Sequence, residues 1–142
     1  MTAAMICIDA SFIVRYFTSS STESIYQQYW SQWQTKGYNI VAPTLIIYEV
    51  CNAFHRAFVA GQITQEEAEQ FLERALNLGL RFSGDAELHR QALKIAQRHN
   101  LPATYDAHYL ALAERLGIEF WTADRRLFNA VRSSLSWVNL VR

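Results

Sequence analysis

The stretch TYDAHYLALAERLGIEFWTADRRL, residues 104–127, carries the pattern that decides the fold. Its first part is apolar at helical spacing and closes at Gly117, as helices commonly do. Its second part, IEFWTAD, is a short apolar run that predicts a buried strand. Asp106 stands where the helix opens, and Asp124 stands where the strand closes. Both aspartates suit helix caps and both suit metal ligands, so the rest of the chain has to separate these roles.

The remaining sequence alternates between short strands and helices. Strands are expected over residues 4–9, 38–43, 80–84, 118–124 and 136–141. Helices are expected over residues 11–17, 22–37, 44–61, 64–79, 85–100, 104–117 and 125–133. Pro43 suits the first turn of a helix, and Thr64 and Glu67 have the spacing of a capping box. The alternation predicts one α/β domain over residues 1–142, with a central, mainly parallel sheet of about five strands flanked by helices on both faces.

Composition narrows the class of protein. The chain has 142 residues, of which 51% are hydrophobic and 18% charged, so we expect a compact core. No apolar run approaches the roughly 20 residues that span a bilayer, and Asp9 interrupts the first apolar run too early for a signal peptide, which indicates a cytoplasmic protein. Cys7 and Cys51 lie among apolar residues and are expected to be buried thiols. The net charge of zero argues against binding nucleic acid by bulk charge, but allows a nuclease with local contacts.

The acidic residues are the candidates for chemistry. Asp9 closes the first strand and, like Asp106 and Asp124, has an alternative role as a helix cap. Glu49 differs because it lies in the middle of a predicted helix, inside an apolar stripe, where it caps nothing. Its alternative role is an edge position that reaches water and pairs with Arg56 or His55.

Geometry links some of these acids. Ligands of open parallel sheets bind beyond the carboxyl ends of the strands, where the strand order reverses. If the strands before Asp9 and Asp124 are neighbours, these two carboxylates converge. Clustered carboxylates repel one another unless a cation neutralises them, and sites built from oxygen ligands suit Mg²⁺ or Mn²⁺.

Four segments in order resemble a PIN domain. They are IDAS at 8–11, PTLIIYEVCNAF at 43–54, YDAHYLALAERLG at 105–117 and FWTADRRL at 120–127. The compact size is similar to that of VapC-type toxins of toxin–antitoxin pairs. The resemblance implies a PIN-like fold, a Mg²⁺-dependent endoribonuclease, an RNA substrate, a small cognate antitoxin protein and a homodimer.

The resemblance also implies the roles of individual residues. Asp9, Glu49, Asp106 and Asp124 match the acidic residues of the family, which are catalytic and hold the metal, with Asp9 and Asp106 as the first choice for direct ligands. Ser11 and Thr122 match its small polar accessory positions. Arg15, Arg125 and Arg126 lie near the acidic edge in sequence and suit RNA phosphates, although solvated helix faces explain them as well.

Other interpretations stay open. The main alternative is a non-catalytic PIN-like module that binds RNA or protein. A receiver-type phosphoacceptor domain also gathers acids at strand ends, but the last strand lacks the required lysine. The aromatic residues Tyr26, Tyr29, Trp30 and Trp33 fall at helical spacing and are expected in the core or on a partner-facing stripe. His55 and His108 are expected at the surface or behind the acids rather than as metal ligands.

Overall fold

The central element of the fold is a parallel sheet. The computed structural model describes residues 4–19 and 24–142, and the sheet within them has the strand order β3-β2-β1-β4-β5. The strands are β1 (Met5–Ile8), β2 (Asn39–Pro43), β3 (Arg81–Ser83), β4 (Glu119–Thr122) and β5 (Val138–Leu140). Each neighbouring pair of strands is parallel, which confirms the predicted five-stranded sheet.

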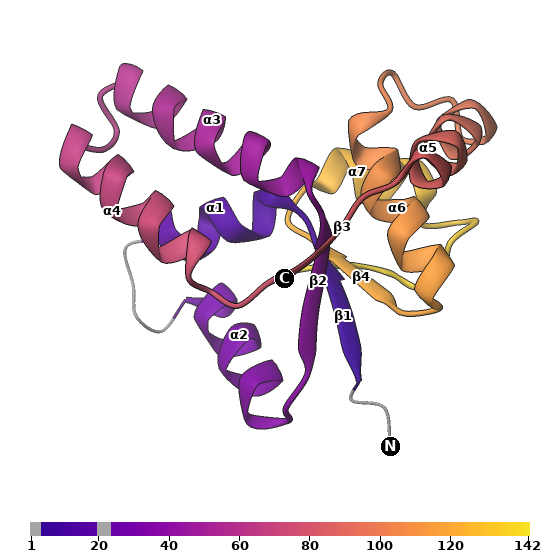
Figure 1. Ribbon diagram of the computed structural model, residues 1–142, viewed down its shortest axis with the longest axis horizontal. Helices are drawn as coiled ribbons and strands as arrows, with labels where there is room; N and C mark the ends of the chain where they lie inside the picture. The colour runs from indigo at the N-terminus through magenta and orange to yellow at the C-terminus, as the bar shows by residue number, and fades with distance from the viewer. Residues whose placement is uncertain (1–3, 20–23) are drawn as a thin grey trace.

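Helices connect the strands and cover both faces of the sheet. They are α1 (Ala10–Thr18), α2 (Ile25–Thr35), α3 (Leu45–Val59), α4 (Gln65–Leu76), α5 (Ala86–Arg98), α6 (Tyr105–Leu116) and α7 (Arg125–Val131). The sheet is seen nearly edge-on in Figure 1, with α1 to α4 on one side and α5 to α7 on the other. The chain moves outward from β1 to β3 and then returns past β1 to β4, so right-handed crossovers place the two sets of helices on opposite faces.

Local sequence signals account for the helix boundaries. Asp9, Ser24, Asp85 and Asp124 each accept a hydrogen bond from a backbone N–H in the first turn of the helix that follows. Thr64 and Glu67 form the predicted capping box at the start of α4. Gly117 closes α6 with a φ of 65°, a left-handed conformation that glycine adopts without strain. The first residues of the helix predicted over 22–37 lie outside the described residues.

The core lies on both faces of the central strands. Helix α6 packs against β1, β2 and β4, and α5 packs against α6 from outside. On the opposite face, the indole of Trp33 packs against Phe12 with ring centroids 5.2 Å apart. Trp30 and Trp33 are buried, and Tyr26 and Tyr29 pack against the same core. The predicted aromatic stripe therefore belongs to the core.

Two local predictions are wrong. Pro43 is the last residue of β2, within the strand expected over residues 38–43, but it does not lie in the first turn of the next helix, which begins at Leu45. The position tolerates proline because the register between β1 and β2 ends at Val41, so no ladder bond to β1 is lost. Cys7 is buried as expected, but Cys51 is exposed, because it lies on the outer face of α3 beside the exposed residue Tyr48.

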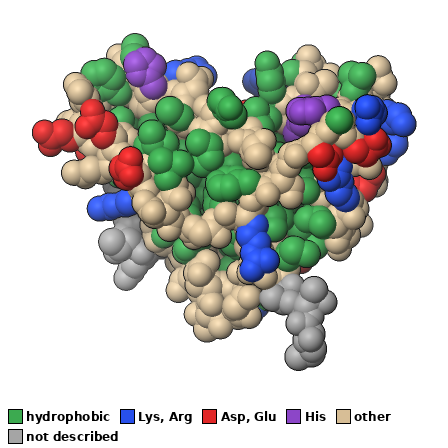
Figure 2. Space-filling view, in the orientation of Figure 1, with side chains coloured by type: hydrophobic (Ala, Val, Ile, Leu, Met, Phe, Trp, Pro, Cys, Tyr) green, Lys and Arg blue, Asp and Glu red, His purple; other side chains and the backbone are tan. Residues whose placement is uncertain are grey.

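The helices leave a notch above the carboxyl ends of the strands. The pair α3 and α4 diverges from α5 and α6, and β1 ends beneath the gap, where α1 and α3 begin (Figure 1). The space-filling view shows that the surface is hollowed between these two groups of helices (Figure 2). Among the helices of residues 4–19 and 24–142, none has the length and apolarity that crossing a bilayer requires.

The packing of α6 predicts a large effect of a core truncation. Leu110 is fully buried in α6, so Leu110→Ala should lower the free energy of unfolding by about 2–5 kcal/mol. The same substitution at Leu93 of α5, which is 50% exposed, should change it by less than about 0.5 kcal/mol. Urea unfolding followed by circular dichroism measures both values, and equal losses would contradict this account of the core.

Candidate metal-dependent active site

The sheet brings Asp9 and Asp124 to the same edge. Strands β1 and β4 are neighbours with Ile8 opposite Trp121, so the condition set by the sequence is met. Asp9 directly follows β1, and Asp124 follows β4 by two residues. The strand order reverses between these strands, since β2 and β3 lie on one side of β1 and β4 and β5 on the other. Such a switch point is where open α/β sheets place their ligand sites.

Asp9 is a buried carboxylate held by three donors. Its exposed fraction is 4%. One oxygen, Oδ1, accepts hydrogen bonds from the Ser11 hydroxyl at 2.6 Å and from the Phe12 backbone N–H at 3.1 Å. The other oxygen, Oδ2, accepts from the Thr122 hydroxyl. Burial and, to a smaller extent, the charge of Asp106 raise the pKa of Asp9 to about 7, although these hydrogen bonds oppose the shift.

Ser11 and Thr122 join the two strand ends around this carboxylate. The Ser11 Oγ accepts from the Ala123 backbone N–H at 3.0 Å, and the Thr122 Oγ1 accepts from the Asp124 backbone N–H at 3.0 Å. The two hydroxyl oxygens lie 3.3 Å apart. Both predicted accessory positions therefore contact Asp9 and fix the loop that carries Asp124.

Glu49 has a partner that the sequence analysis missed. The hydroxyl of Tyr109 donates a hydrogen bond of 2.5 Å to Glu49 Oε1 and so joins α6 to α3. Burial and the charge of Glu49 raise the pKa of Tyr109 well above its usual range, so the phenol stays protonated and donates. Neither Arg56 nor His55 forms an ion pair with Glu49 within the described residues, so that expected pairing is wrong. The sequence contained one indication that Tyr109 lies near the acids, because it follows Asp106 by one turn of the same helix.

Asp106 lies in the first turn of α6 and is not its cap. The cap residue is Thr104, so the alternative of a capping role is wrong for Asp106, whereas Asp9 and Asp124 do cap helices. Burial, together with the charges of Asp124 and Glu49, raises the pKa of Asp106 to about 6. Because Asp106 also raises the pKa of Asp9, all four predicted acids share one electrostatic environment.

The carboxylates keep oxygens available for a ligand. Glu49 uses Oε1 for Tyr109, and Asp124 uses Oδ1 for the N–H groups of Arg126 and Leu127. Within the described residues, their second oxygens and both oxygens of Asp106 accept no hydrogen bond. In that same part of the chain, no three His, Cys, Asp or Glu side chains already form a group that could hold a metal ion.

The basic and imidazole side chains lie around this centre. Arg15 is exposed on α1 and lines a groove that also contains Ser11 and Glu49. Arg125 and Arg126 are exposed in the first turn of α7, directly after Asp124.

The histidines lie outside the cluster of acids. His55 is exposed on α3. His108 contacts His89, with 2.8 Å between Nε2 and Nδ1, and its other ring nitrogen lies 2.7 Å from the Thr104 carbonyl oxygen.

Comparison with known families agrees with this arrangement. The sequence profile of the PIN domain matches residues 6–133, which include all four acids. The chain belongs to the PIN domain family. A relative, ribonuclease VapC3 of Pyrobaculum aerophilum, is 34% identical over 85 residues. The aligned segment covers 58% of this chain and 64% of VapC3, so the chain spans less than two thirds of that relative.

Solved PIN-like structures share the fold at low sequence identity. PAE2754 from Pyrobaculum aerophilum superposes with a TM-score of 0.68 at 24% identity, over 94% of this chain and 91% of that one. Mycobacterium tuberculosis VapC20, a toxin that cleaves the sarcin–ricin loop, superposes with a TM-score of 0.65 at 16% identity, over 92% of this chain and 95% of VapC20. FitAcB from Neisseria gonorrhoeae gives 0.61 at 14% identity, over 97% of each chain.

The buried carboxylate predicts how stability depends on pH without metal. The pKa of Asp9 is about 7 in the folded chain and close to 3.8 in the unfolded chain, so the folded state binds more protons between these values. Stability should therefore fall as pH rises from about 4 to about 7. Denaturant unfolding in EDTA should give a lower midpoint at pH 8 than at pH 5.

The variant Asp9→Asn tests the source of this pH dependence. Its amide oxygen can still accept from Ser11 and Phe12, and its amide group can donate to Thr122, so the fold should persist. The loss of stability between pH 5 and pH 8 should shrink to the part contributed by Asp106. An unchanged pH dependence in the variant would contradict the assignment to Asp9.

The bond between Tyr109 and Glu49 predicts a second effect on stability. Tyr109→Phe removes a donor to a charged group and should cost about 1.5–3 kcal/mol. The matched control is Tyr105→Phe in the same helix, where the ring is 60% exposed and the cost should stay below about 0.5 kcal/mol. Chemical denaturation at pH 8 compares the two, and equal stabilities would show that the bond contributes nothing.

Proposed function

We propose that this PIN domain protein is a Mg²⁺-dependent endoribonuclease, the toxin of a VapBC-type toxin–antitoxin pair. The observation that supports it best is the arrangement of Asp9, Glu49, Asp106 and Asp124 around the carboxyl ends of β1 and β4. The pKa values of Asp9 and Asp106 are raised to about 7 and about 6, in part by their acidic neighbours. A divalent cation would relieve this repulsion.

The donor set fits Mg²⁺ or Mn²⁺. All four side chains offer oxygens, and three of them have an oxygen that accepts no hydrogen bond within the described residues. We place Asp9 and Asp106 as direct ligands, with Asp124 and Glu49 binding directly or through water. A bound cation supplies charge neutralisation on the scissile phosphate and lowers the pKa of a water molecule.

The residues of the chain itself position the reactants. Ser11 and Thr122 hold Asp9 in one orientation, and Tyr109 does the same for Glu49. Glu49 or Asp124 orients the attacking water. Attack of this water forms a new bond to phosphorus and breaks the bond to the 3′-oxygen. The water gives up one proton and the leaving 3′-oxygen takes one up, so the products are a 3′-hydroxyl and a 5′-phosphate. The exposed guanidinium groups of Arg125 and Arg126 suit RNA phosphates beside the site.

The same proposal covers partners and location. Similarity to VapC3 and to the fold of VapC20 supports a small cognate antitoxin protein and an RNA substrate. We also propose a homodimer of single-domain chains in the cytoplasm, where such a substrate is present. Light scattering of the purified chain measures the oligomeric state.

Cleavage of a mixed pool of structured RNAs tests the activity. The parent should cut RNA with Mg²⁺ or Mn²⁺ and not with EDTA, and Asp106→Asn should abolish cleavage because it removes a ligand. Asp9→Asn should do the same while remaining folded. The matched control is Glu114→Gln, an exposed carboxylate on the same helix as Asp106, which should cut at the parent rate.

Thermal melting separates the outcomes of this test. Cutting that survives Asp106→Asn would reject the site. No cutting, together with a melting temperature that Mg²⁺ leaves unchanged, would favour the non-catalytic binding module. No cutting with clear stabilisation by Mg²⁺ would reject the RNA pool rather than the site. DNA of the same sequences tests the alternative substrate.

Growth of a bacterial host tests the toxin assignment. Induced expression of the parent should arrest growth, and expression of Asp106→Asn to the same level should not. Normal growth with a high yield of folded parent protein would contradict the toxin role and leave a nuclease of another function.

A further inference from the structure

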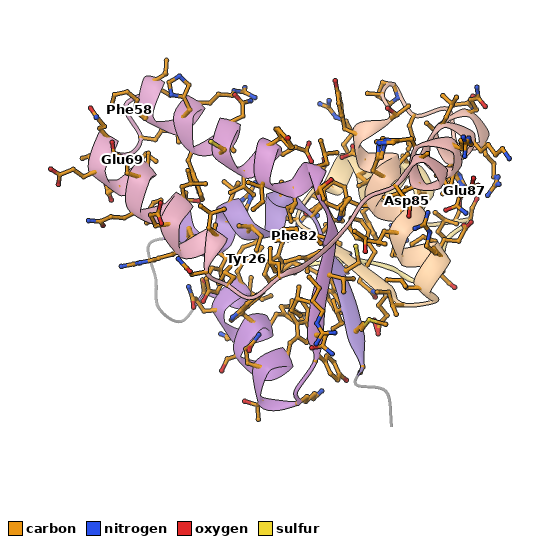
Figure 3. All side chains as sticks on the ribbon, in the orientation of Figure 1. Tyr26, Phe58, Glu69, Phe82, Asp85 and Glu87 are labelled. Carbon is orange, nitrogen blue, oxygen red and sulfur yellow. The ribbon has the colours of Figure 1, made fainter. Side chains whose placement is uncertain are left out.

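A groove leads along α1 and α3, away from the acidic centre, which consists of the four acids Asp9, Glu49, Asp106 and Asp124. It has a volume of about 360 Å³ and lies between α1 and α3, where Ser11 and Glu49 line the end next to the acids. The remaining polar lining consists of Arg15, Asn52 and Arg56. A second groove of about 720 Å³ shares Arg56 with the first and continues toward the end of α3, where Phe58 is labelled in Figure 3.

The charge of the first groove is divided along its length. Glu49 is the one carboxylate among the described residues that line it, and Arg15 and Arg56 lie in the last turns of α1 and α3. Neither Arg15 nor Arg56 forms an ion pair within the described residues. Both side chains are exposed. Unpaired guanidinium groups that face a common groove favour an anion with several oxygen acceptors.

The spacing suits a chain of phosphates. Arg15 follows Ser11 by one turn of α1, roughly 6 Å, and Arg56 follows Glu49 by two turns of α3, roughly 10 Å. Neighbouring phosphates of a stacked strand rise by about 3.4 Å, so these positions lie within about three nucleotides of a phosphate at the acids. The lining also includes the small residues Ala10 and Ala53, which would let a sugar–phosphate backbone approach closely.

We infer that this groove is a subsite for the RNA backbone, in which Arg15 and Arg56 bind the phosphates that flank the scissile bond and Asn52 donates a hydrogen bond to the same strand. The inference rests on the proposed ribonuclease function and adds a binding track along α1 and α3. Phosphate contacts carry no base information, so the subsite should position RNA of any sequence.

Binding of a fluorescent single-stranded RNA to Asp106→Asn protein, which leaves the RNA intact, tests the subsite. Fluorescence anisotropy is measured over a series of KCl concentrations. Arg56→Gln and Arg15→Gln, each added to this background, should weaken binding about threefold or more on RNAs of different sequence. Each should also reduce the slope of log affinity against log salt by about 0.7, the value for one lost contact to a single strand.

Arg98→Gln is the matched control. Arg15, Arg56 and Arg98 are each basic residues in the last turn of their helix, so all three substitutions remove the same favourable interaction with the helix dipole. Arg98 lines neither groove, and its variant should bind RNA as the background protein does. The inference would be overturned if Arg56→Gln, Arg15→Gln and Arg98→Gln bound RNA with equal affinity and equal salt slope. A groove that holds a protein segment and no RNA would give this result.

Cleavage kinetics separate this inference from the proposed function. In the active protein with Mg²⁺, Arg56→Gln should raise KM and leave kcat unchanged, because the flanking contact is the same in the ground state and the transition state. If the parent does not cut RNA and Mg²⁺ leaves its melting temperature unchanged, the proposed function fails while the binding comparison still tests the groove. If the parent cuts RNA and Arg56→Gln has parental KM and affinity, the groove assignment alone fails.

Discussion

The buried carboxylate of Asp9 is the constraint on which the rest of the structure depends. A nearly inaccessible acid persists at a strand end because Ser11, Thr122 and the Phe12 N–H hold it. These donors come from α1 and from the end of β4, so satisfying one carboxylate fixes the two central strands and the loop that carries Asp124. Stability and site geometry are therefore set by the same few bonds.

The cluster formed by Asp9, Glu49, Asp106 and Asp124 has an unfavourable electrostatic energy in the folded chain. Burial and like charges raise the pKa values of Asp9 and Asp106, so a proton or a cation lowers the free energy of the folded chain. Tyr109 stabilises the carboxylate of Glu49 by donating a hydrogen bond. The phenol remains protonated, and so remains a donor, throughout the physiological pH range. Raised pKa values in a cluster of buried acids are typical of functional sites that bind a ligand.

The sequence predicted the parallel α/β sheet, and it placed Asp9 and Asp124 at strand ends that share one edge if their strands are neighbours, because strand ends and caps are local signals. The structure meets that condition, since β1 pairs with β4. It did not separate the burial of Cys7 from the exposure of Cys51, since both have apolar neighbours and the difference depends on which face of α3 meets the core. The partner of Glu49 was missed for a similar reason. Tyr109 lies 60 positions away, and nothing in the spacing of α3 points to α6. The helical first turn suggested for Pro43 was wrong, because the place of this proline at the strand end depends on where the register with β1 ends.

The bond between Thr122 and Asp9 joins residues 113 positions apart, and its consequence concerns biosynthesis. A ribosome that adds about 5–20 residues per second has released β1, α1 and α3 well before it makes β4. Until β4 docks beside β1, Asp9 lacks a donor and Asp124 has no fixed place. In a nascent chain, this edge of the sheet therefore stays incomplete until β4 has been made and has docked beside β1.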